Sequence, residues 1–140
     1  MKKIVFVCLG NICRSPMAEF VMKSLTDQLE IESRATSSWE HGNPIHRGTQ
    51  AIFKKYAISY DRNKTSQQIS AADFADFDYV IGMDESNVRD LKWMAPEDFQ
   101  HKIYQFEEES VPDPWYTGDF DQTYDLVLAG CKKWLERLDG

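Results

Sequence analysis

Short apolar runs alternate along this chain with segments in which apolar residues recur every three or four positions. Residues 4–7, Ile-Val-Phe-Val, contain no polar side chain and predict a fully buried strand. Ser15 as the N-cap and Pro16 in the first turn predict a helix soon after it. The helical spacing of this segment is carried by Met17, Phe20, Val21, Ser24, Leu25 and Leu29.

Three further strands are expected from the pattern: a weak one over residues 34–38, a third over 79–81 and a short fourth over 103–104. Asn43-Pro44 predicts the cap of a second helix. Its apolar face consists of Ile45, Thr49, Ile52, Phe53 and Tyr56.

Helix starts are also indicated further along the chain. Residues 70–73 read as a capping-box-like start of a short helix, and Asp84, Ser86 and Asn87 read as helix-capping residues. The last helix is amphipathic, with its apolar stripe at Tyr124, Val127, Leu128, Cys131, Trp134, Leu135 and Leu138. Cys131 lies on this stripe, where we expect a core residue.

Alternating strands and helices favour an α/β fold with a parallel sheet. A chain of 140 residues with 42% hydrophobic content can bury one core but hardly two. No repeat, linker or low-complexity tract interrupts it. We therefore expect residues 1–140 to form a single α/β domain.

The net charge and the composition of the chain argue against several classes of binding partner. A net charge of −7 argues against nucleic acid or an anionic membrane surface as a partner. The apolar run after Lys3 is too short for a signal peptide, and no stretch approaches the ~20 apolar residues of a membrane span. The three cysteines, an odd number, do not make a disulfide framework. We expect a cytoplasmic protein without membrane insertion, present as a monomer or weak dimer.

The candidate chemistry lies directly after the first strand. Cys8 and Arg14 flank the residues Leu9, Gly10, Asn11, Ile12 and Cys13. This spacing closes a loop around one tetrahedral oxyanion, with backbone N–H groups pointing inward and the positive end of the following helix beside it. Such a field stabilises a thiolate as readily as a phosphate, so Cys8 is the candidate nucleophile.

The other residue types of the loop suit the same chemistry. Arg14 offers a planar fork of donors for two phosphate oxygens. Gly10 and Asn11 tolerate the positive φ that a tight anion-binding loop requires. Ser15 can donate its hydroxyl to the Cys8 sulfur. A structural cysteine that happens to precede an arginine is the alternative, but the order of strand, glycine and Ser-Pro helix start favours a phosphatase.

Three separated segments carry a resemblance to a known family. Residues 7–16 resemble the active-site loop of the low-molecular-weight protein tyrosine phosphatases, residues 73–87 the middle region and residues 111–116 the general-acid loop. The resemblance extends over essentially the whole chain. It implies a three-layer domain with a four-stranded parallel sheet flanked by helices and a phosphate-binding loop after the first strand.

The same resemblance implies the activity. It predicts hydrolysis of phosphotyrosine and small aryl phosphates through a cysteinyl-phosphate intermediate, with no metal or other cofactor. The expected partners are tyrosine-phosphorylated proteins, with phosphate or a related oxyanion in the site. Asp113 matches the general acid, which protonates the leaving tyrosyl oxygen and then activates water. From sequence alone an Asp-Pro pair in a loop is usually a turn.

Aromatic residues in loops indicate what kind of substrate the pocket accepts. Trp39, Trp115 and Tyr116 match the rim positions of the family's pocket, although many members carry a tyrosine where Trp115 stands. A core role is the alternative for each of them. Near Lys64 many members carry a histidine that supports the phosphate loop, and this chain has none there.

Cys13 leaves two interpretations open. It could pack its small side chain under the loop, or form a reversible disulfide with Cys8 that protects the nucleophile, as the resemblance implies. We favour the redox interpretation, because a stabilised thiolate oxidises first.

Two other functions are alternatives to a phosphatase. An arsenate reductase on the same scaffold would need further cysteines around residues 82–89, where the chain has none. A non-catalytic phosphotyrosine-binding module would be expected to lose Cys8, Arg14 or Asp113, and all three are present.

Overall fold

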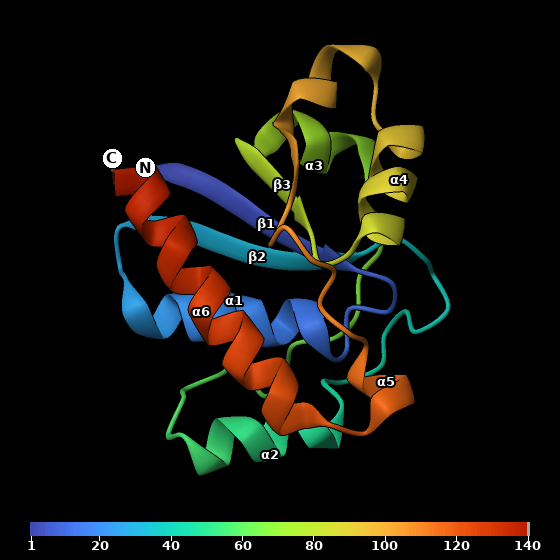
Figure 1. Ribbon diagram of the computed structural model, residues 1–140. Helices are drawn as coiled ribbons and strands as arrows, with labels where there is room; N and C mark the ends of the chain where they lie inside the picture. Colours follow the sequence, from blue (N-terminus) through green and yellow to red (C-terminus); the bar gives the residue numbers. More distant parts are fainter. Residues whose placement is uncertain (140) are drawn as a thin grey trace.

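Four strands form one parallel sheet, and helices cover both of its faces (Figure 1). The structure is a computed structural model and describes residues 1–139. The strands, β1 (Lys2–Cys8), β2 (Leu29–Ala35), β3 (Tyr79–Gly82) and β4 (Ile103–Gln105), lie in the order β2-β1-β3-β4. All three pairings are parallel. The expected α/β fold with a four-stranded parallel sheet is confirmed.

The helices complete a three-layer arrangement. They are α1 (Arg14–Leu25), α2 (Arg47–Lys55), α3 (Ala71–Asp76), α4 (Glu85–Met94), α5 (Pro114–Thr117) and α6 (Phe120–Asp139), with a 3-10 helix at Glu97–Lys102. Side chains of the central strand β1 alternate between the layers. Ile4 and Phe6 belong to the core that includes α1, α2 and α6, whereas Val5 and Val7 belong to the core that includes α3 and α4.

The carboxyl ends of the strands meet at one edge of the sheet. Cys8 ends β1 and is in register with Ala35, the last residue of β2. Gly82, at the end of β3, is paired with Gln105 at the end of β4. The loops that follow all four strands therefore start at the same edge, which is where parallel α/β sheets bind ligands.

Two element boundaries differ from the sequence prediction. The second strand covers Leu29–Ala35 rather than 34–38, and α1 ends at Leu25. Inward positions of β2 include Ser33, which is buried with 0% exposure, so the alternation carries no continuous apolar signal. Leu29 fits the helical spacing of the segment before it, but it is the first residue of β2 and packs against the core from that strand.

Two helix caps also differ. Cys13, not Ser15, is the N-cap residue of α1, which leaves the Ser15 hydroxyl directed at Cys8. The cap of α2 is His46, whose Nδ1 accepts a hydrogen bond from Gly48 N, and not Asn43-Pro44. Pro44 instead lies in an isolated bridge with Thr65.

Other local predictions are confirmed. Ser70 and Asp73 form a reciprocal capping box at the start of α3. Asp84 caps α4 by accepting a hydrogen bond from Asn87 N. Helix α6 contains the predicted stripe and begins at Phe120, earlier than Tyr124.

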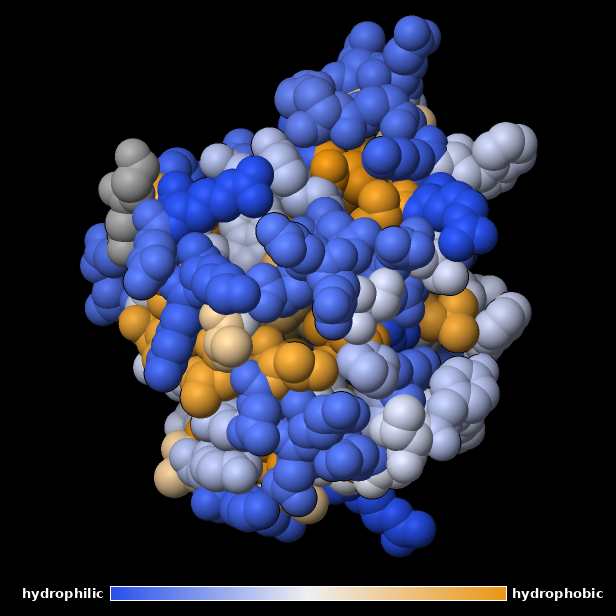
Figure 2. Space-filling view, in the orientation of Figure 1, coloured by the Kyte–Doolittle hydropathy of each residue, from blue (hydrophilic) through white to orange (hydrophobic). Residues whose placement is uncertain are grey.

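The surface of the molecule is mostly hydrophilic. Hydrophilic residues cover most of the face seen in Figure 2, and apolar residues show between them in separate patches. Among residues 1–139, no helix combines the length and the apolar character that crossing a bilayer requires.

A glycine in α6 permits close packing, and its replacement gives a test of the fold. A Cβ on Gly130 would overlap the ring of Phe106. We expect Gly130→Ala to lower the free energy of unfolding by about 1–3 kcal/mol through overpacking, as measured by urea denaturation. Helix propensity alone predicts the opposite sign, a gain of up to ~1 kcal/mol. Adding Phe106→Leu should recover part of the loss; a stabilised Gly130→Ala would contradict this packing.

Candidate active site

The Cys8 sulfur lies inside the loop that joins β1 to α1. It accepts hydrogen bonds from the backbone N–H groups of Asn11, at 3.3 Å, and Ser15, at 3.4 Å. The Ser15 hydroxyl is 3.1 Å from the sulfur. Cys8 is buried, with 3% of its surface exposed. Because three donor groups converge on the sulfur, the loop stabilises negative charge there.

The carbonyl groups of the loop point outward and are held by neighbouring segments. Leu9 O accepts from Ser37 N and Oγ, and Gly10 O accepts from Ser66 Oγ at 2.7 Å. The Ile12 and Cys13 carbonyls accept from His46 N and Thr49 Oγ1 respectively. With these carbonyls turned away, N–H groups of the loop are left for an anion at its centre.

Asn11 and Gly10 shape the loop in different ways. Asn11 has a φ of 56°, as its residue type predicts. The expectation of a positive φ at Gly10 is wrong. A Cβ at this position would lie 3.3 Å from Cγ of Glu40, so glycine allows the Glu40 side chain to pack closely on the loop.

Arg14 is held in place by two acceptors. Its Nη1 donates to Asp84 Oδ2 at 2.6 Å and to Val111 O at 2.9 Å. The side chain is 3% exposed. Burial opposes the charge of this guanidinium, but the charges of Cys8 and Asp84 outweigh it and raise the pKa of Arg14. The fork is therefore a fixed cation beside the Cys8 sulfur.

Asp113 both stabilises the turn at the start of α5 and lines the pocket that contains Arg14. Its Oδ1 accepts from Trp115 N at 3.0 Å, which caps the short helix α5, and Pro114 occupies the first turn. Its Oδ2 lies 3.5 Å from Arg14 Nη2. The same carboxyl group thus orders its loop and faces the Arg14 guanidinium.

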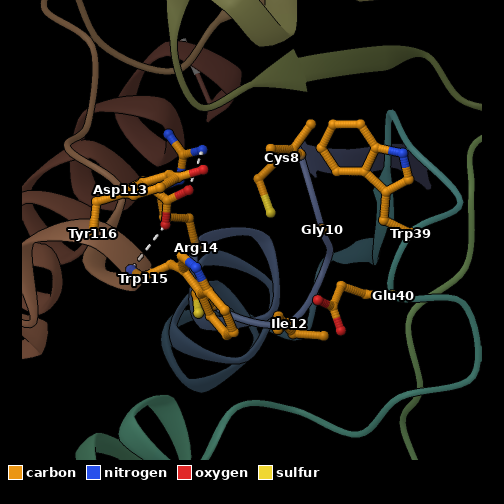
Figure 3. A pocket seen from close by; sticks show the side chains of 11 residues that line it. Cys8, Gly10, Ile12, Arg14, Trp39, Glu40, Asp113, Trp115 and Tyr116 are labelled. Atoms are coloured by element: carbon orange, nitrogen blue, oxygen red, sulfur yellow. Dashed lines mark hydrogen bonds and ion pairs between the residues drawn. The ribbon is translucent and has the colours of Figure 1, made fainter.

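Cys8, Arg14 and Asp113 line one pocket of about 130 Å³ (Figure 3). The structure brings together ten of the sequence-predicted residues there: Cys8, Leu9, Gly10, Ile12, Cys13, Arg14, Trp39, Asp113, Trp115 and Tyr116. Asn11 and Ser15 act from behind the loop. Trp39 and Tyr116 are each 77% exposed, and the Trp115 ring meets His46 edge-on at 5.6 Å between centroids, so the three aromatic residues are not core.

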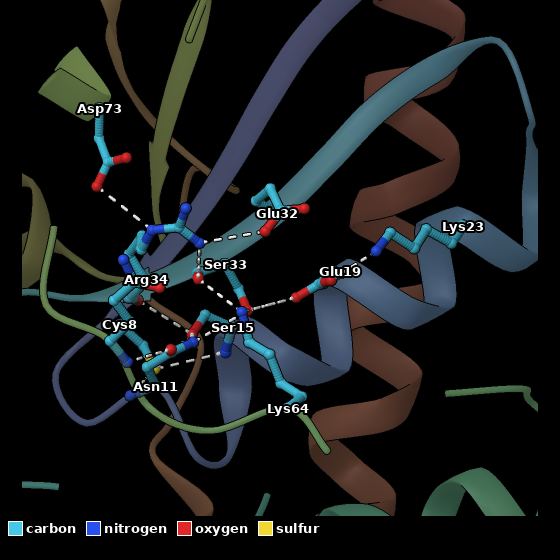
Figure 4. Close-up of polar contacts among 11 residues, drawn as sticks. Cys8, Asn11, Ser15, Glu19, Lys23, Glu32, Ser33, Arg34, Lys64 and Asp73 are labelled. Atoms are coloured by element: carbon cyan, nitrogen blue, oxygen red, sulfur yellow. Dashed lines mark hydrogen bonds and ion pairs between the residues drawn. The ribbon is translucent and has the colours of Figure 1, made fainter. Parts of the chain in front are cut away.

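A buried hydrogen-bond chain supports the loop from below (Figure 4). Gln67 N donates to Asn11 Oδ1, so Asn11 Nδ2 faces the two serines, donating to Ser15 Oγ at 2.8 Å and Ser33 Oγ at 3.0 Å. Ser15 Oγ accepts from Asn11, and its own proton can go to Cys8 Sγ at 3.1 Å or to the Arg34 carbonyl at 3.3 Å. Ser33 Oγ in turn donates to Glu19 at 2.6 Å.

Lys64 occupies the place where related sequences led us to look for a histidine. Its Nζ donates to Ser33 O at 2.9 Å and lies 3.4 Å from Glu19 Oε1. Lys23 approaches the other oxygen of Glu19 at 2.6 Å. Glu19 is only 2% exposed, and two ammonium groups compensate its charge. Lys64 and Glu19 thus brace this loop.

The two remaining cysteines are both buried and free. Burial, followed by the charges of Cys8 and Asp113, raises the pKa of the Cys13 thiol. Burial alone raises the pKa of Cys131, whose Sγ contacts the Ala18 carbonyl at 3.7 Å. The core position expected for Cys131 is confirmed.

Sequence reasoning missed two residues of the site. Glu40 lines the pocket, and only the Trp39 beside it pointed to this loop. Asp84 was interpreted as a helix cap alone, yet it caps α4 with Oδ1 and holds Arg14 with Oδ2. A carboxylate two residues after the third strand of a parallel sheet was the available signal for its second role.

The dual role of Asp84 permits a clean test. Asn at this position keeps an oxygen for the cap but cannot hold Arg14 by charge. We expect Asp84→Asn to lower kcat/KM for an aryl phosphate about 10- to 100-fold, equivalent to a charged hydrogen bond of ~1.5–3 kcal/mol. Tm should change little. An unchanged kcat/KM would mean that the Val111 carbonyl suffices to orient Arg14.

Comparison with known proteins agrees with this geometry. Residues 3–140 match the family described as low molecular weight phosphotyrosine protein phosphatase. The curated protein PtpA of Staphylococcus aureus (strain bovine RF122 / ET3-1), a low molecular weight protein-tyrosine-phosphatase, is 45% identical over 141 residues, covering 94% of this chain and 90% of its own length.

Solved structures give the same result. SP-PTP, a low molecular weight protein tyrosine phosphatase from Streptococcus pyogenes, is 63% identical with a TM-score of 0.97, covering 99% of this chain and 93% of its own. The Drosophila arginine phosphatase DARP is 32% identical with a TM-score of 0.89, covering 100% and 99%. Together with the phosphate loop, these matches show that the chain belongs to the low molecular weight phosphotyrosine protein phosphatases, which are phosphoric monoester hydrolases.

Proposed function

We propose that this protein hydrolyses phosphotyrosine in proteins, and small aryl phosphates, through a cysteinyl-phosphate intermediate. The observation that carries the proposal is the Cys8 sulfur, which receives three donors inside a loop that also presents Arg14. Asp113 lines the same pocket (Figure 3). Nucleophile, oxyanion-binding groups and a carboxyl group for proton transfer are the parts that this reaction requires.

In the first step the Cys8 thiolate attacks phosphorus. An S–P bond forms as the bond from phosphorus to the tyrosyl oxygen breaks, and Asp113 donates a proton to that oxygen so that tyrosine leaves neutral. Arg14 and the loop N–H groups hold the non-bridging oxygens throughout. Ser15 donates to the sulfur in the resting enzyme.

In the second step water attacks the phosphorus of the intermediate. The Asp113 carboxylate, now deprotonated, takes a proton from the water, and the S–P bond breaks to release phosphate. Ser15 stabilises the departing thiolate, which restores the starting state. Both steps balance without a metal ion or an organic cofactor.

The aromatic rim supports an aryl substrate. Trp39, Trp115 and Tyr116 stand at the mouth of the pocket, where flat side chains can pack on the phosphotyrosine ring. Phosphoserine is too short to place its phosphate in the loop while its backbone stays outside the rim. We place the protein in the cytoplasm, acting on tyrosine-phosphorylated proteins.

The test is steady-state hydrolysis of a phosphotyrosyl peptide in the presence of a metal chelator. A matched phosphoseryl peptide and phosphoarginine, the latter suggested by the Drosophila relative, serve as the competing substrates. We expect turnover of the phosphotyrosyl peptide at least about 100-fold above both, and acid-quenched samples should carry phosphate on the peptide that contains Cys8. No turnover by the folded, reduced protein would contradict the proposal.

Redox protection of the nucleophile is part of the proposal. Peroxide oxidises the Cys8 thiolate to a sulfenic acid, which condenses with the Cys13 thiol to a disulfide and releases water. We expect thiol treatment to restore most activity to the oxidised parent and far less to oxidised Cys13→Ser, as measured by recovered aryl phosphatase activity. Equal recovery in the two proteins would rule out protection by Cys13.

A further inference from the structure

A carboxylate lines the wall of the phosphate-binding pocket, although a pocket that binds an anion is expected to avoid negative side chains. Glu40 lies beside Trp39 at the end of the loop that follows β2, and its carboxylate is directed toward the pocket near Gly10 and Ile12 (Figure 3). Its stem packs on the phosphate loop, since Cγ is 3.3 Å from where a Gly10 Cβ would be. Glu40 is therefore a pocket residue rather than a free surface side chain.

The position of this carboxylate is fixed by its own loop. Asn43 Nδ2 donates to Glu40 Oε2 at 2.6 Å, and Asn43 N donates to the Glu40 carbonyl at 2.8 Å. The loop is tied to its neighbour by Gly42 N to Ser66 O at 3.0 Å and Ser66 N to Asn43 O at 2.8 Å. Because Ser66 Oγ also donates to Gly10 O, the loop that carries Glu40 and the phosphate loop are tied to the same residue.

Glu40 carries a charge that the described residues leave uncompensated. Across residues 1–139 no Lys, Arg or His forms an ion pair with it, and no hydrogen bond reaches Oε1. The pocket cation, Arg14, is already engaged by Asp84 and lies near Asp113. A phosphate dianion entering the loop is consequently repelled by Glu40, because both charges then lie in one pocket and salt screens such a pair incompletely.

A cation on the substrate would remove this repulsion. We propose that Glu40 is a specificity-determining residue that selects phosphotyrosine with a lysine or arginine as its immediate neighbour in the peptide. The neighbouring cation pairs with Glu40 Oε1, and its alkyl stem packs on the exposed ring of Trp39. This inference rests on the proposed function, because it concerns the substrate of the same site.

The test compares phosphotyrosyl peptides that differ only at the residues flanking phosphotyrosine, which are Lys, Ala or Glu. We expect the parent to show a kcat/KM about 10-fold higher for the best Lys peptide than for its Glu counterpart. Glu40→Gln should reduce this ratio to about 2-fold, chiefly by improving the Glu peptide. Gln keeps an oxygen for Asn43 Nδ2, so the loop geometry is retained.

A second variant separates this local effect from the overall charge of −7. Glu136→Gln removes the same charge from an exposed position near the carboxyl end of α6. This end of α6 lies beside the start of β1, since Lys2 Nζ donates to Leu138 O at 2.9 Å, whereas Cys8 lies at the other end of that strand. It should keep the full preference for Lys. Equal kcat/KM for Lys and Glu peptides in the parent would overturn the inference, as would a preference that survives in Glu40→Gln or falls equally in Glu136→Gln.

Hydrolysis of p-nitrophenyl phosphate and peptide affinities keep this outcome distinct from failure of the proposed function. The small substrate has no flanking residue, so its turnover by the parent reports on the chemistry alone. Peptide Kd values measured by calorimetry report the Lys-over-Glu preference whether or not turnover occurs. A protein that binds the Lys peptide about 10-fold more tightly but hydrolyses nothing would contradict the proposed function and support the role of Glu40.

Discussion

Replacement of Cys8 by serine is expected to lower kcat for a phosphotyrosyl peptide by at least about 10⁴-fold, or roughly 5 kcal/mol of transition-state stabilisation. The loop presents two N–H groups and a hydroxyl to the sulfur, an arrangement that stabilises an anion at this position. A serine hydroxyl is far harder to ionise than a thiol and has no base within this set to take its proton. The proposed S–P intermediate cannot form.

Binding should survive this change. Arg14 is held by Asp84 and Val111 rather than by Cys8, and the loop carbonyls are anchored by neighbouring segments. We therefore expect Cys8→Ser to keep the Tm of the parent within a few degrees and to bind the phosphotyrosyl peptide with a Kd within about 10-fold of the parent's KM, as measured by calorimetry. Turnover within 10-fold of the parent by a serine variant free of parent enzyme would exclude Cys8 as the nucleophile.

The phosphate loop could be predicted from sequence because its chemistry is local. The residues from Cys8 to Ser15 are contiguous, so spacing and residue type determine a strand, an anion-binding loop and a helix start. Asn11 has the positive φ that its type predicts. The N-cap of α1 is Cys13 and not Ser15. Sequence patterns do not resolve a shift of two residues at a helix end.

The residues that support the loop could not be predicted in the same way. Glu19, Ser33 and Lys64 come from α1, β2 and the segment after α2, and their role depends on a tertiary hydrogen-bond chain. Ser33 even obscured its own strand, because a buried serine breaks the apolar alternation of β2. Glu40 was missed for a related reason, since the packing of its stem on Gly10 is a contact between separate loops.

Replacement of Asp113 by asparagine is expected to lower kcat/KM for phosphotyrosine about 10²- to 10⁴-fold, the usual contribution of a general acid. The amide oxygen can still accept from Trp115 N, so α5 should begin at the same residue and the loop should keep its conformation. Asp119→Asn is the matched control. Its oxygen accepts from Gln122 N at the start of α6, and Asp119 does not line the pocket. It should retain the activity of the parent.

Dependence on the leaving group distinguishes general-acid catalysis from a structural role of Asp113. Because kcat/KM covers the steps up to S–P bond formation, a missing proton donor should matter most for poorly departing groups such as tyrosine. With dinitrophenyl phosphate, whose leaving group needs no proton, the loss in kcat/KM for Asp113→Asn should shrink to about 10-fold or less. Loss that is equal for both substrates would mean that Asp113 acts by ordering its loop or by pairing with Arg14, and an unchanged rate for both would remove it from the mechanism.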